Sequence, residues 1–211
     1  LKVLRLGGNQ LGGLLPVIAK ADTNNNNATL TTSKCVLVVL ELGGNRLSGR
    51  IQDALEGLGG CVNLEVLDLS SNTFTGMLQQ PEKKPKAGSA LKSSVKQYQM
   101  PLGGWWPGLR ELRLNNNDIA GVLPPSLGQC QELQVLHLGS NKLSGPIPPE
   151  LCRCRAMRVL QLHGNELEGE VPTELTRFSN LTHLYLYGNS GIAGRLPPGT
   201  REQCRSLQVV G

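Results

Sequence analysis

Histidines and cysteines are the residues of this 211-residue sequence whose types could support metal or acid–base chemistry. The three histidines are His137, His163 and His183, and Cys152 and Cys154 form a single CxC pair. A zinc site needs three or four such ligands that converge on one point, and no second cysteine pair lies at zinc-finger spacing. GxxxxGK[ST], HExxH and GxSxG motifs are also missing from the sequence, as is a GxGxxG after a strand. We therefore expect no catalysis, no resident metal and no cofactor.

The histidines lie within an internal repeat that runs through the chain. LRELRLNNNDIAGVLPPSLGQC begins at Leu109, LQVLHLGSNKLSGPIPPELCRC at Leu133 and MRVLQLHGNELEGEVPTELTRF at Met157, in steps of 24 residues. The same opening recurs at Leu1, Leu37, Leu64 and Leu181, and a truncated eighth copy begins at Leu207. Seven units therefore share one period, with insertions at about 17–35 and 79–105.

Each unit predicts one short strand followed by a turn. The LxxLxL opening alternates apolar and variable residues, as a strand with one buried face does. One strand per unit, about 4.8 Å from the next, would build a parallel sheet roughly 35 Å long. An asparagine at the ninth position can satisfy backbone groups of two neighbouring coils, because its amide both donates and accepts. That asparagine recurs as Asn9, Asn45, Asn72, Asn117, Asn141, Asn165 and Asn189.

The full pattern, LxxLxLxxNxLxGxIPxxLxxLxx, resembles the plant-type leucine-rich repeat, and the resemblance covers nearly the whole chain. It implies an α/β-type repeat solenoid, a right-handed coil with a parallel β-sheet on the concave face and irregular or 3-10 structure on the convex side. Residues 1–211 would form a single portion of that solenoid, with seven repeats and a truncated eighth. Because missing capping repeats would expose the core, we expect this portion to belong to a longer array.

The second insertion carries most of the chain's formal net charge of +5. It contains five lysines and one acidic residue, Glu82, which gives a net charge of +4. The lysines are Lys83, Lys84, Lys86, Lys92 and Lys96. This insertion is either a solvated loop or a docking arm, with Trp105, for an acidic protein or an anionic membrane surface. The rest of the solenoid is nearly neutral, so nucleic acid is not an expected partner.

Four cysteines share one position of the repeat, three residues before the next unit's first leucine. They are Cys61, Cys130, Cys154 and Cys204, and Trp106 and Phe178 occupy the same position. We expect this column to be buried and its thiols to stay reduced, since inward-pointing side chains in one column seldom have disulfide geometry. The paired cysteines that extracellular plant receptors of this family carry in their end caps are not seen. Neither the cysteines nor the glycosylation sequons at Asn27 and Asn180 identify the compartment.

The strand positions that face solvent supply the candidate partner-binding residues. The fifth position reads Arg5, Glu41, Asp68, Arg113, His137, Gln161 and Tyr185 along the stack. The last four units are rich in Arg and Tyr, residue types that are common anchors at interfaces. The predicted site comprises Arg110, Arg113, His137, Arg158, Gln161, His163, His183, Tyr185 and Tyr187. The alternative is a solvated sheet face without a partner.

We expect a non-catalytic protein–protein interaction or scaffolding module in one of two settings. The first, slightly favoured by the two insertions, is an accessory subunit of a larger intracellular or organellar assembly, for example a membrane-protein complex. The second is the ectodomain of a plant-like leucine-rich-repeat receptor, or an enzyme inhibitor of this family, that recognises a peptide or a secreted protein. The two sequons favour the second setting, and a glycan at Asn27 or Asn180 would identify it. No apolar run approaches the roughly 20 residues that a membrane helix needs.

Overall fold

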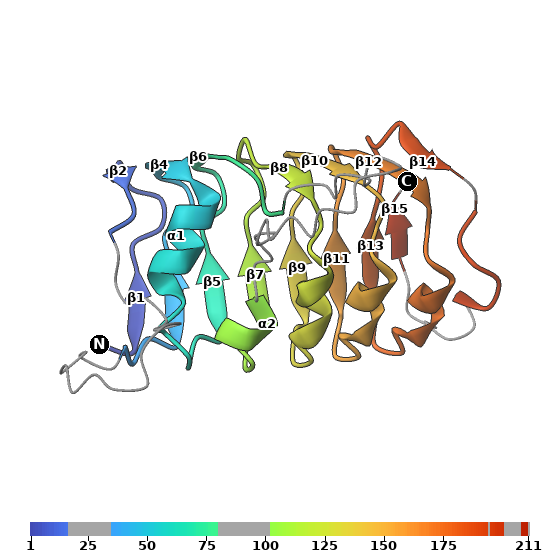
Figure 1. Cartoon of the computed structure of the whole chain (residues 1–211), viewed down its shortest axis with the longest axis horizontal. Coiled ribbons are helices and arrows are strands. Elements are labelled where there is room, and N and C mark those ends of the chain that lie inside the picture. The colour runs from blue at the N-terminus through green and yellow to red at the C-terminus, as the bar shows by residue number, and fades with distance from the viewer. Residues whose placement is uncertain (17–34, 80–101, 194, 201–207, 211) are drawn as a thin grey trace, which may run out of the picture.

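One short strand from each coil joins an eight-stranded parallel sheet. The computed structural model describes residues 1–16, 35–79, 102–193, 195–200 and 208–210. The strands are β1 (Val3–Arg5), β3 (Val39–Glu41), β5 (Val66–Asp68), β7 (Glu111–Arg113), β9 (Val135–His137), β11 (Val159–Gln161), β13 (His183–Tyr185) and β15 (Gln208–Val210), paired in that order (Figure 1). Neighbouring strands keep one register, so that Leu40, Leu67 and Leu112 are successive partners. The predicted solenoid with one parallel strand per coil is confirmed.

After its asparagine, each coil adds a second extended segment, which Figure 1 shows along the upper edge of the stack. These segments form a three-stranded sheet of β2 (Gly12–Leu14), β4 (Arg46–Arg50) and β6 (Thr73–Thr75), and a four-stranded sheet of β8 (Ala120–Val122), β10 (Lys142–Gly145), β12 (Glu166–Glu170) and β14 (Gly191–Ala193). The recurring glycine is required there. Gly121 has a φ of 83°, and a Cβ at this position would overlap the carbonyl oxygen of Gln79.

The convex side is mostly 3-10 structure, and prolines mark where two of the 3-10 segments begin. The helical segments are α1 (Ile51–Leu58), α2 (Leu102–Trp105), η1 (Pro125–Gln129), η2 (Pro149–Arg153) and η3 (Thr173–Arg177). A proline begins η1 and η2, because its fixed φ suits the first helical position. The second coil has no proline there and instead buries Ile51, Ala54, Leu55 and Leu58 at helical spacing. A regular α-helix thus replaces the predicted irregular or 3-10 segment in that coil.

The core consists mainly of stacked leucines and includes one fully buried tryptophan. Leu40, Leu136 and Leu160 are fully buried between the strands and the convex segments. Trp106 is also fully buried, as its position in the repeat predicts, and its Nε1 donates to the carbonyl oxygen of Leu58 at 3.3 Å. Trp105 is partly buried and packs edge-on against Trp106, with ring centroids 5.8 Å apart. It therefore contacts the core on the convex side.

The asparagine at the ninth position ties each coil to the preceding one. The Nδ2 of Asn165 donates to the carbonyl oxygen of Leu162 in its own coil and to that of Leu138 in the preceding coil, both at 3.0 Å. Its Oδ1 accepts from the backbone N–H of Leu143 at 2.9 Å. Asn45, Asn72, Asn117, Asn141 and Asn189 bond in the same way. The predicted structural role of these asparagines is confirmed.

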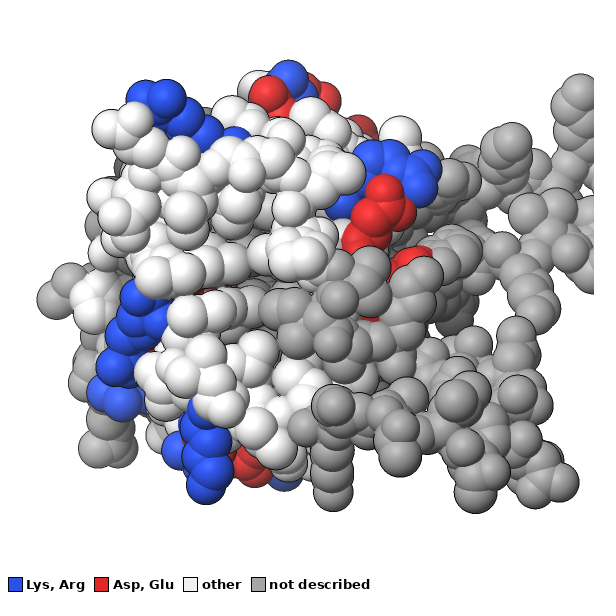
Figure 2. Space-filling view, turned by 90° about the vertical axis from the view of Figure 1, so that its left-hand side faces the viewer, with Lys and Arg blue, Asp and Glu red and all other residues white. Residues whose placement is uncertain are grey.

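The first coil exposes several apolar side chains. Leu11 is 41% exposed, whereas Leu47, at the same position of the second coil, is only 6% exposed. Leu14 is 74% exposed. Figure 2 looks onto this end of the stack and shows few charged side chains among the described residues, most of them near its margin. This end is therefore an apolar surface.

One cysteine pair differs from the expectation of reduced thiols. Cys35 and Cys61 form a disulfide, with their Cα atoms 4.8 Å apart. This distance lies within the range that a disulfide spans, because the two cysteines stand on adjacent coils at one level of the stack. The prediction that Cys61 is a free thiol was wrong. Cys130, Cys152 and Cys154 are free and buried, and Cys204 lies outside the described residues.

Truncating a core leucine should test the strand register. Leu136→Ala should lower the free energy of unfolding by about 2–5 kcal/mol, because it leaves a cavity in the leucine stack. Urea unfolding followed by circular dichroism measures the change. The control is Val135→Ala on the same strand, half-buried on the opposite face, which should cost about 1 kcal/mol or less. Equal losses in the two variants would contradict the register.

Removing the disulfide should destabilise the first and second coils, whose ends it joins. The bond closes a loop across a sequence separation of 26 residues, for which loop entropy predicts a contribution of about 3–4 kcal/mol. Dithiothreitol should therefore lower the urea midpoint of the wild type. A Cys35→Ala, Cys61→Ala double variant should start with the lower midpoint and not respond to the reductant. A wild type that is insensitive to dithiothreitol, with both thiols open to alkylation, would disprove the bond.

Candidate partner-binding site

The strand register places the predicted site residues in columns on the solvent-facing side of the sheet. Arg113, His137, Gln161 and Tyr185 are successive partners in strands β7, β9, β11 and β13. In each of these strands the middle residue is buried and its two neighbours are half-buried. The predicted solvent-facing positions are therefore the residues that line one continuous face.

Four rings of the sixth and seventh coils contact one another on this face. His163 stacks on Tyr187 with ring centroids 4.8 Å apart, and His183 stacks on Tyr185 at 6.1 Å. Tyr185 meets both His163 and Tyr187 edge-on, at 6.2 and 6.4 Å. We call His163, His183, Tyr185 and Tyr187 the ring cluster. Tyr187 is 44% exposed, so the cluster presents a large apolar ring to solvent.

A glycine in the fifth coil makes room for one of these rings. Gly139 occupies the same repeat position as His163 in the next coil and Tyr187 in the coil after that. A Cβ on Gly139 would collide with the imidazole of His163. The imidazole therefore lies over the backbone of the preceding coil. Gly139 was not among the predicted site residues, although its place at the seventh repeat position could have identified it.

Three polar atoms on the fourth to sixth coils of this face, one of them in the ring cluster itself, are buried without a hydrogen-bond partner in the described part of the chain. They are Nε2 of His137, Nδ1 of His163 and Oδ1 of Asn115. A buried polar atom without a partner is destabilising, typically by about 1–3 kcal/mol. This part of the face thus has unused hydrogen-bonding capacity. Asn115, in the seventh repeat position of the fourth coil, was also missed as a site residue.

Burial lowers the pKa of His137 to about 4, and the nearby positive charge of Arg113 adds to the effect. His163 lowers the pKa further, whereas Asp68 raises it. His137 is therefore neutral at pH 7 and can act as both donor and acceptor.

The predicted arginines have different surroundings. Arg113 pairs with Glu111 on its own strand, Nη2 to Oε2 2.6 Å, and Arg110 approaches Glu65 at 3.7 Å. Arg158 is exposed and forms no ion pair with a described residue. Its carbonyl oxygen accepts a hydrogen bond from the hydroxyl of Thr182 at 2.9 Å. Arg110 and Arg113 lie on the fourth coil and Arg158 on the sixth, and none of the three is part of the ring cluster.

The first three coils of the face are already charge-neutralised or aliphatic. Arg5 pairs with Glu41 at 2.8 Å, and Asp68 accepts hydrogen bonds from the backbone and hydroxyl of Ser70. The ring cluster thus lies in the later half of the face.

The predicted docking arm is only partly within the described structure. Lys83, Lys84, Lys86, Lys92 and Lys96 lie outside the described residues, as does Asn27. Trp105 lies on the convex side against Gly59 and is not brought together with the ring cluster. In the part of the chain that the structure describes, no His, Cys, Asp and Glu side chains group as a metal site, and no helix is long and apolar enough to cross a membrane.

Coils in register around a leucine core, with a solvent-facing sheet, define a repeat solenoid. Two family models of the leucine-rich repeat match the sequence, one at residues 107–167 and one at residues 63–81. The chain belongs to the leucine-rich-repeat proteins. No curated protein matches the sequence.

The solved structures similar to this chain include plant receptor ectodomains. The leucine-rich-repeat ectodomain of the plant membrane receptor kinase GASSHO1/SCHENGEN3 from Arabidopsis thaliana, in complex with CASPARIAN STRIP INTEGRITY FACTOR 2, is 25% identical over 99% of this chain, with a TM-score of 0.65. A chain of the Arabidopsis thaliana BIR3–SERK2 complex is 29% identical over 84%, with a TM-score of 0.57. The Arabidopsis thaliana BIR2 ectodomain is 30% identical over 72%, with a TM-score of 0.52. This chain spans 23%, 86% and 66% of those three chains, respectively.

The low pKa of His137 should make stability depend on pH. The folded state holds this proton with a pKa of about 4, against about 6.5 in the unfolded chain. Its contribution to stability is therefore fully present above pH 6.5 and is lost as the pH falls toward 4. NMR titration of the His137 ring, with urea-unfolded protein as the reference, measures both values. His137→Gln should reduce the loss of stability between pH 7 and pH 4.5. A ring that titrates near 6.5 in the folded protein would contradict this.

Proposed function

We propose that this chain is a ligand-recognition segment of a receptor-type leucine-rich-repeat ectodomain, and that it binds a peptide or a protein loop on its sheet face. The ring cluster carries this proposal. Tyrosine and histidine rings offer apolar area together with a polar edge at a low cost in side-chain entropy, which is why such residues anchor interfaces. The half-exposed ring of Tyr187 is the natural first contact.

The dimensions of the face suit an extended segment that runs across the strands. From Arg113 to Tyr185 the strand column makes three steps, about 14 Å at 4.8 Å a step. An extended peptide covers that distance with about four residues. One apolar side chain of the ligand would pack on the ring cluster. Its polar groups would reach Gln161 and, after side-chain rotation, the unpartnered nitrogen of His137.

The receptor setting has more support than the accessory-subunit setting. The similar structures named above include the ectodomain of a plant membrane receptor kinase, solved in complex with CASPARIAN STRIP INTEGRITY FACTOR 2, and the BIR2 ectodomain. The disulfide between Cys35 and Cys61 suits an oxidising compartment, where such bonds persist. An extracellular location is therefore proposed in place of the intracellular or organellar one. Asn180 is exposed, so a glycan on this sequon in the protein from its source would support the secreted setting.

Removing the two tyrosine rings should weaken peptide binding and leave the fold intact. Random 12-residue peptides displayed on phage are first selected on the wild-type protein, and their synthetic copies are then titrated by fluorescence anisotropy. On a Tyr185→Ala, Tyr187→Ala variant the dissociation constants should rise at least tenfold, because interface anchors of this type typically contribute more than about 1 kcal/mol each.

The matched control is Glu168→Ala, an exposed residue of β12 away from the sheet face, which should bind the peptides as the wild type does. Circular dichroism verifies that both variants are folded. Peptides that bind the double variant undiminished would disprove the proposed site. Failure to select any peptide would speak against peptide recognition.

A further inference from the structure

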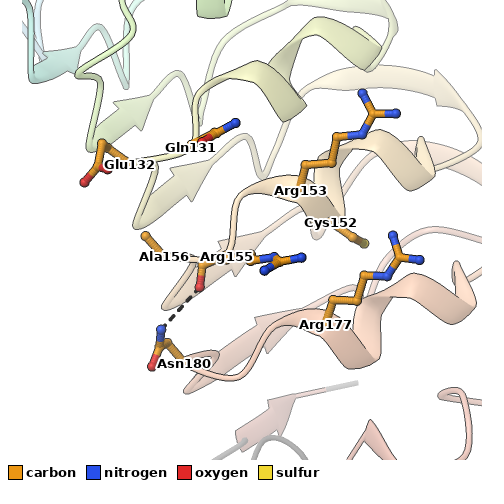
Figure 3. A pocket seen from close by; sticks show the side chains of 8 residues that line it. All are labelled: Gln131, Glu132, Cys152, Arg153, Arg155, Ala156, Arg177 and Asn180. Carbon is orange, nitrogen blue, oxygen red and sulfur yellow. Dashed lines mark hydrogen bonds between the residues drawn. The ribbon is translucent and has the colours of Figure 1, made fainter.

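A cavity lies on another part of the solenoid, between the ends of the 3-10 segments and the starts of the strands. It has a volume of about 590 Å³ and is lined by residues of the fourth to sixth coils (Figure 3). Its charged lining residues are Arg153, Arg155, Arg177 and Glu132. We call this cavity the arginine pocket. It shares no residue with the ring cluster, so it is independent of the function proposed above.

The repeat itself brings two of these arginines together. Arg153 ends η2 and Arg177 ends η3, and the two residues are one repeat of 24 residues apart. Because η2 and η3 belong to adjacent coils, two positive side chains occupy neighbouring steps of one column. The preceding coil has the neutral Gln129 at this position. Like charges at this spacing repel each other unless an anion lies between them.

Within the described residues, no acidic side chain forms an ion pair with these arginines. The five ion pairs of the described chain involve Arg5, Arg50, Arg110, Arg113 and Lys142, and none involves a pocket arginine. Figure 3 shows the three guanidinium groups on one side of the pocket, the side on which the sulfur of Cys152 lies, and the carboxylate of Glu132 on the opposite side. Three positive charges and one negative charge leave the lining with a net charge of +2.

We propose that the arginine pocket binds a small organic molecule with two or more phosphate or sulfate ester groups. Guanidinium groups present planar pairs of N–H donors that match the oxygens of such esters, and several of them together favour a multivalent anion. The cavity volume falls within the roughly 300–1,000 Å³ of small-molecule sites. A single inorganic ion would leave most of this space empty.

The pocket is a binding site without a nucleophile. Cys152 lines it but is 1% exposed, and burial raises the pKa of its thiol to about 12. Its sulfur therefore stays protonated and contributes only apolar surface. The neighbouring Asn180 also lines the pocket, and its amide donates to the carbonyl oxygen of Arg155 at 3.2 Å. A glycan on Asn180 would crowd the entrance, so the binding assay requires protein without that glycan.

The test uses isothermal titration calorimetry in 150 mM NaCl with three probes: inositol hexakisphosphate, sucrose octasulfate and inorganic phosphate. The wild type should bind at least one of the two organic polyanions with a stoichiometry of one, and inorganic phosphate at least tenfold more weakly. An Arg153→Gln, Arg177→Gln double variant should bind the preferred polyanion at least tenfold more weakly than the wild type. Preference for inositol hexakisphosphate identifies phosphate esters, and preference for sucrose octasulfate identifies sulfate esters.

Two controls separate pocket binding from attraction by net charge and from the ring cluster. An Arg46→Gln, Arg195→Gln double variant removes two exposed positive charges elsewhere and should bind as the wild type does. The Tyr185→Ala, Tyr187→Ala variant should also bind the polyanion unchanged. Equal losses in the two arginine variants, undiminished binding by the Arg153→Gln, Arg177→Gln variant, or no binding by the wild type would each overturn the proposal.

Discussion

Each coil of this solenoid is joined to the preceding one by the side-chain amide of an asparagine. The amide of Asn165, for example, makes three hydrogen bonds to backbone groups that the turn after a strand would leave without partners. One of these groups is in its own coil and two are in the preceding coil. Because Asn45, Asn72, Asn117, Asn141 and Asn189 repeat this arrangement, successive coils keep one spacing and one register. Every column of side chains along the stack depends on that register.

Both surfaces proposed as binding sites are consequences of it. The stacking of His163 on Tyr187 joins the seventh position of adjacent coils, and it requires a coil spacing short enough for two rings to touch. Arg153 and Arg177 likewise occupy one repeat position on two adjacent coils, on a different part of the coil. Stacked rings attract one another, whereas neighbouring guanidinium groups repel one another. The same geometry therefore yields a preformed apolar patch on one face and an unneutralised charge on another.

The periodicity of the sequence was enough to predict the strands, their parallel order and the residues on the solvent-facing side. Alternation determines which side chains are buried, so Leu136 and His137 could be assigned to opposite faces without coordinates. The α-helix at Ile51–Leu58 was missed because it depends on the absence of a proline from one coil. The Cys35–Cys61 bond was missed because Cys35 follows an insertion, which hides its level in the stack. The arginine pocket was missed because its residues come from three coils and lie outside the strand pattern.

The two sites also share part of their support, since the sixth coil contributes to both. Asn189 bonds the carbonyl oxygen of Leu162, and so holds the coil of Tyr185 and Tyr187 against that of His163. The arginine pocket is lined by the fourth to sixth coils, with Arg153 on the fifth coil and Arg177 on the sixth. The sixth coil therefore carries both His163 of the ring cluster and Arg177 of the pocket. In a solenoid each coil contacts only its neighbours, so a ligand at either site would act on the other through this shared coil.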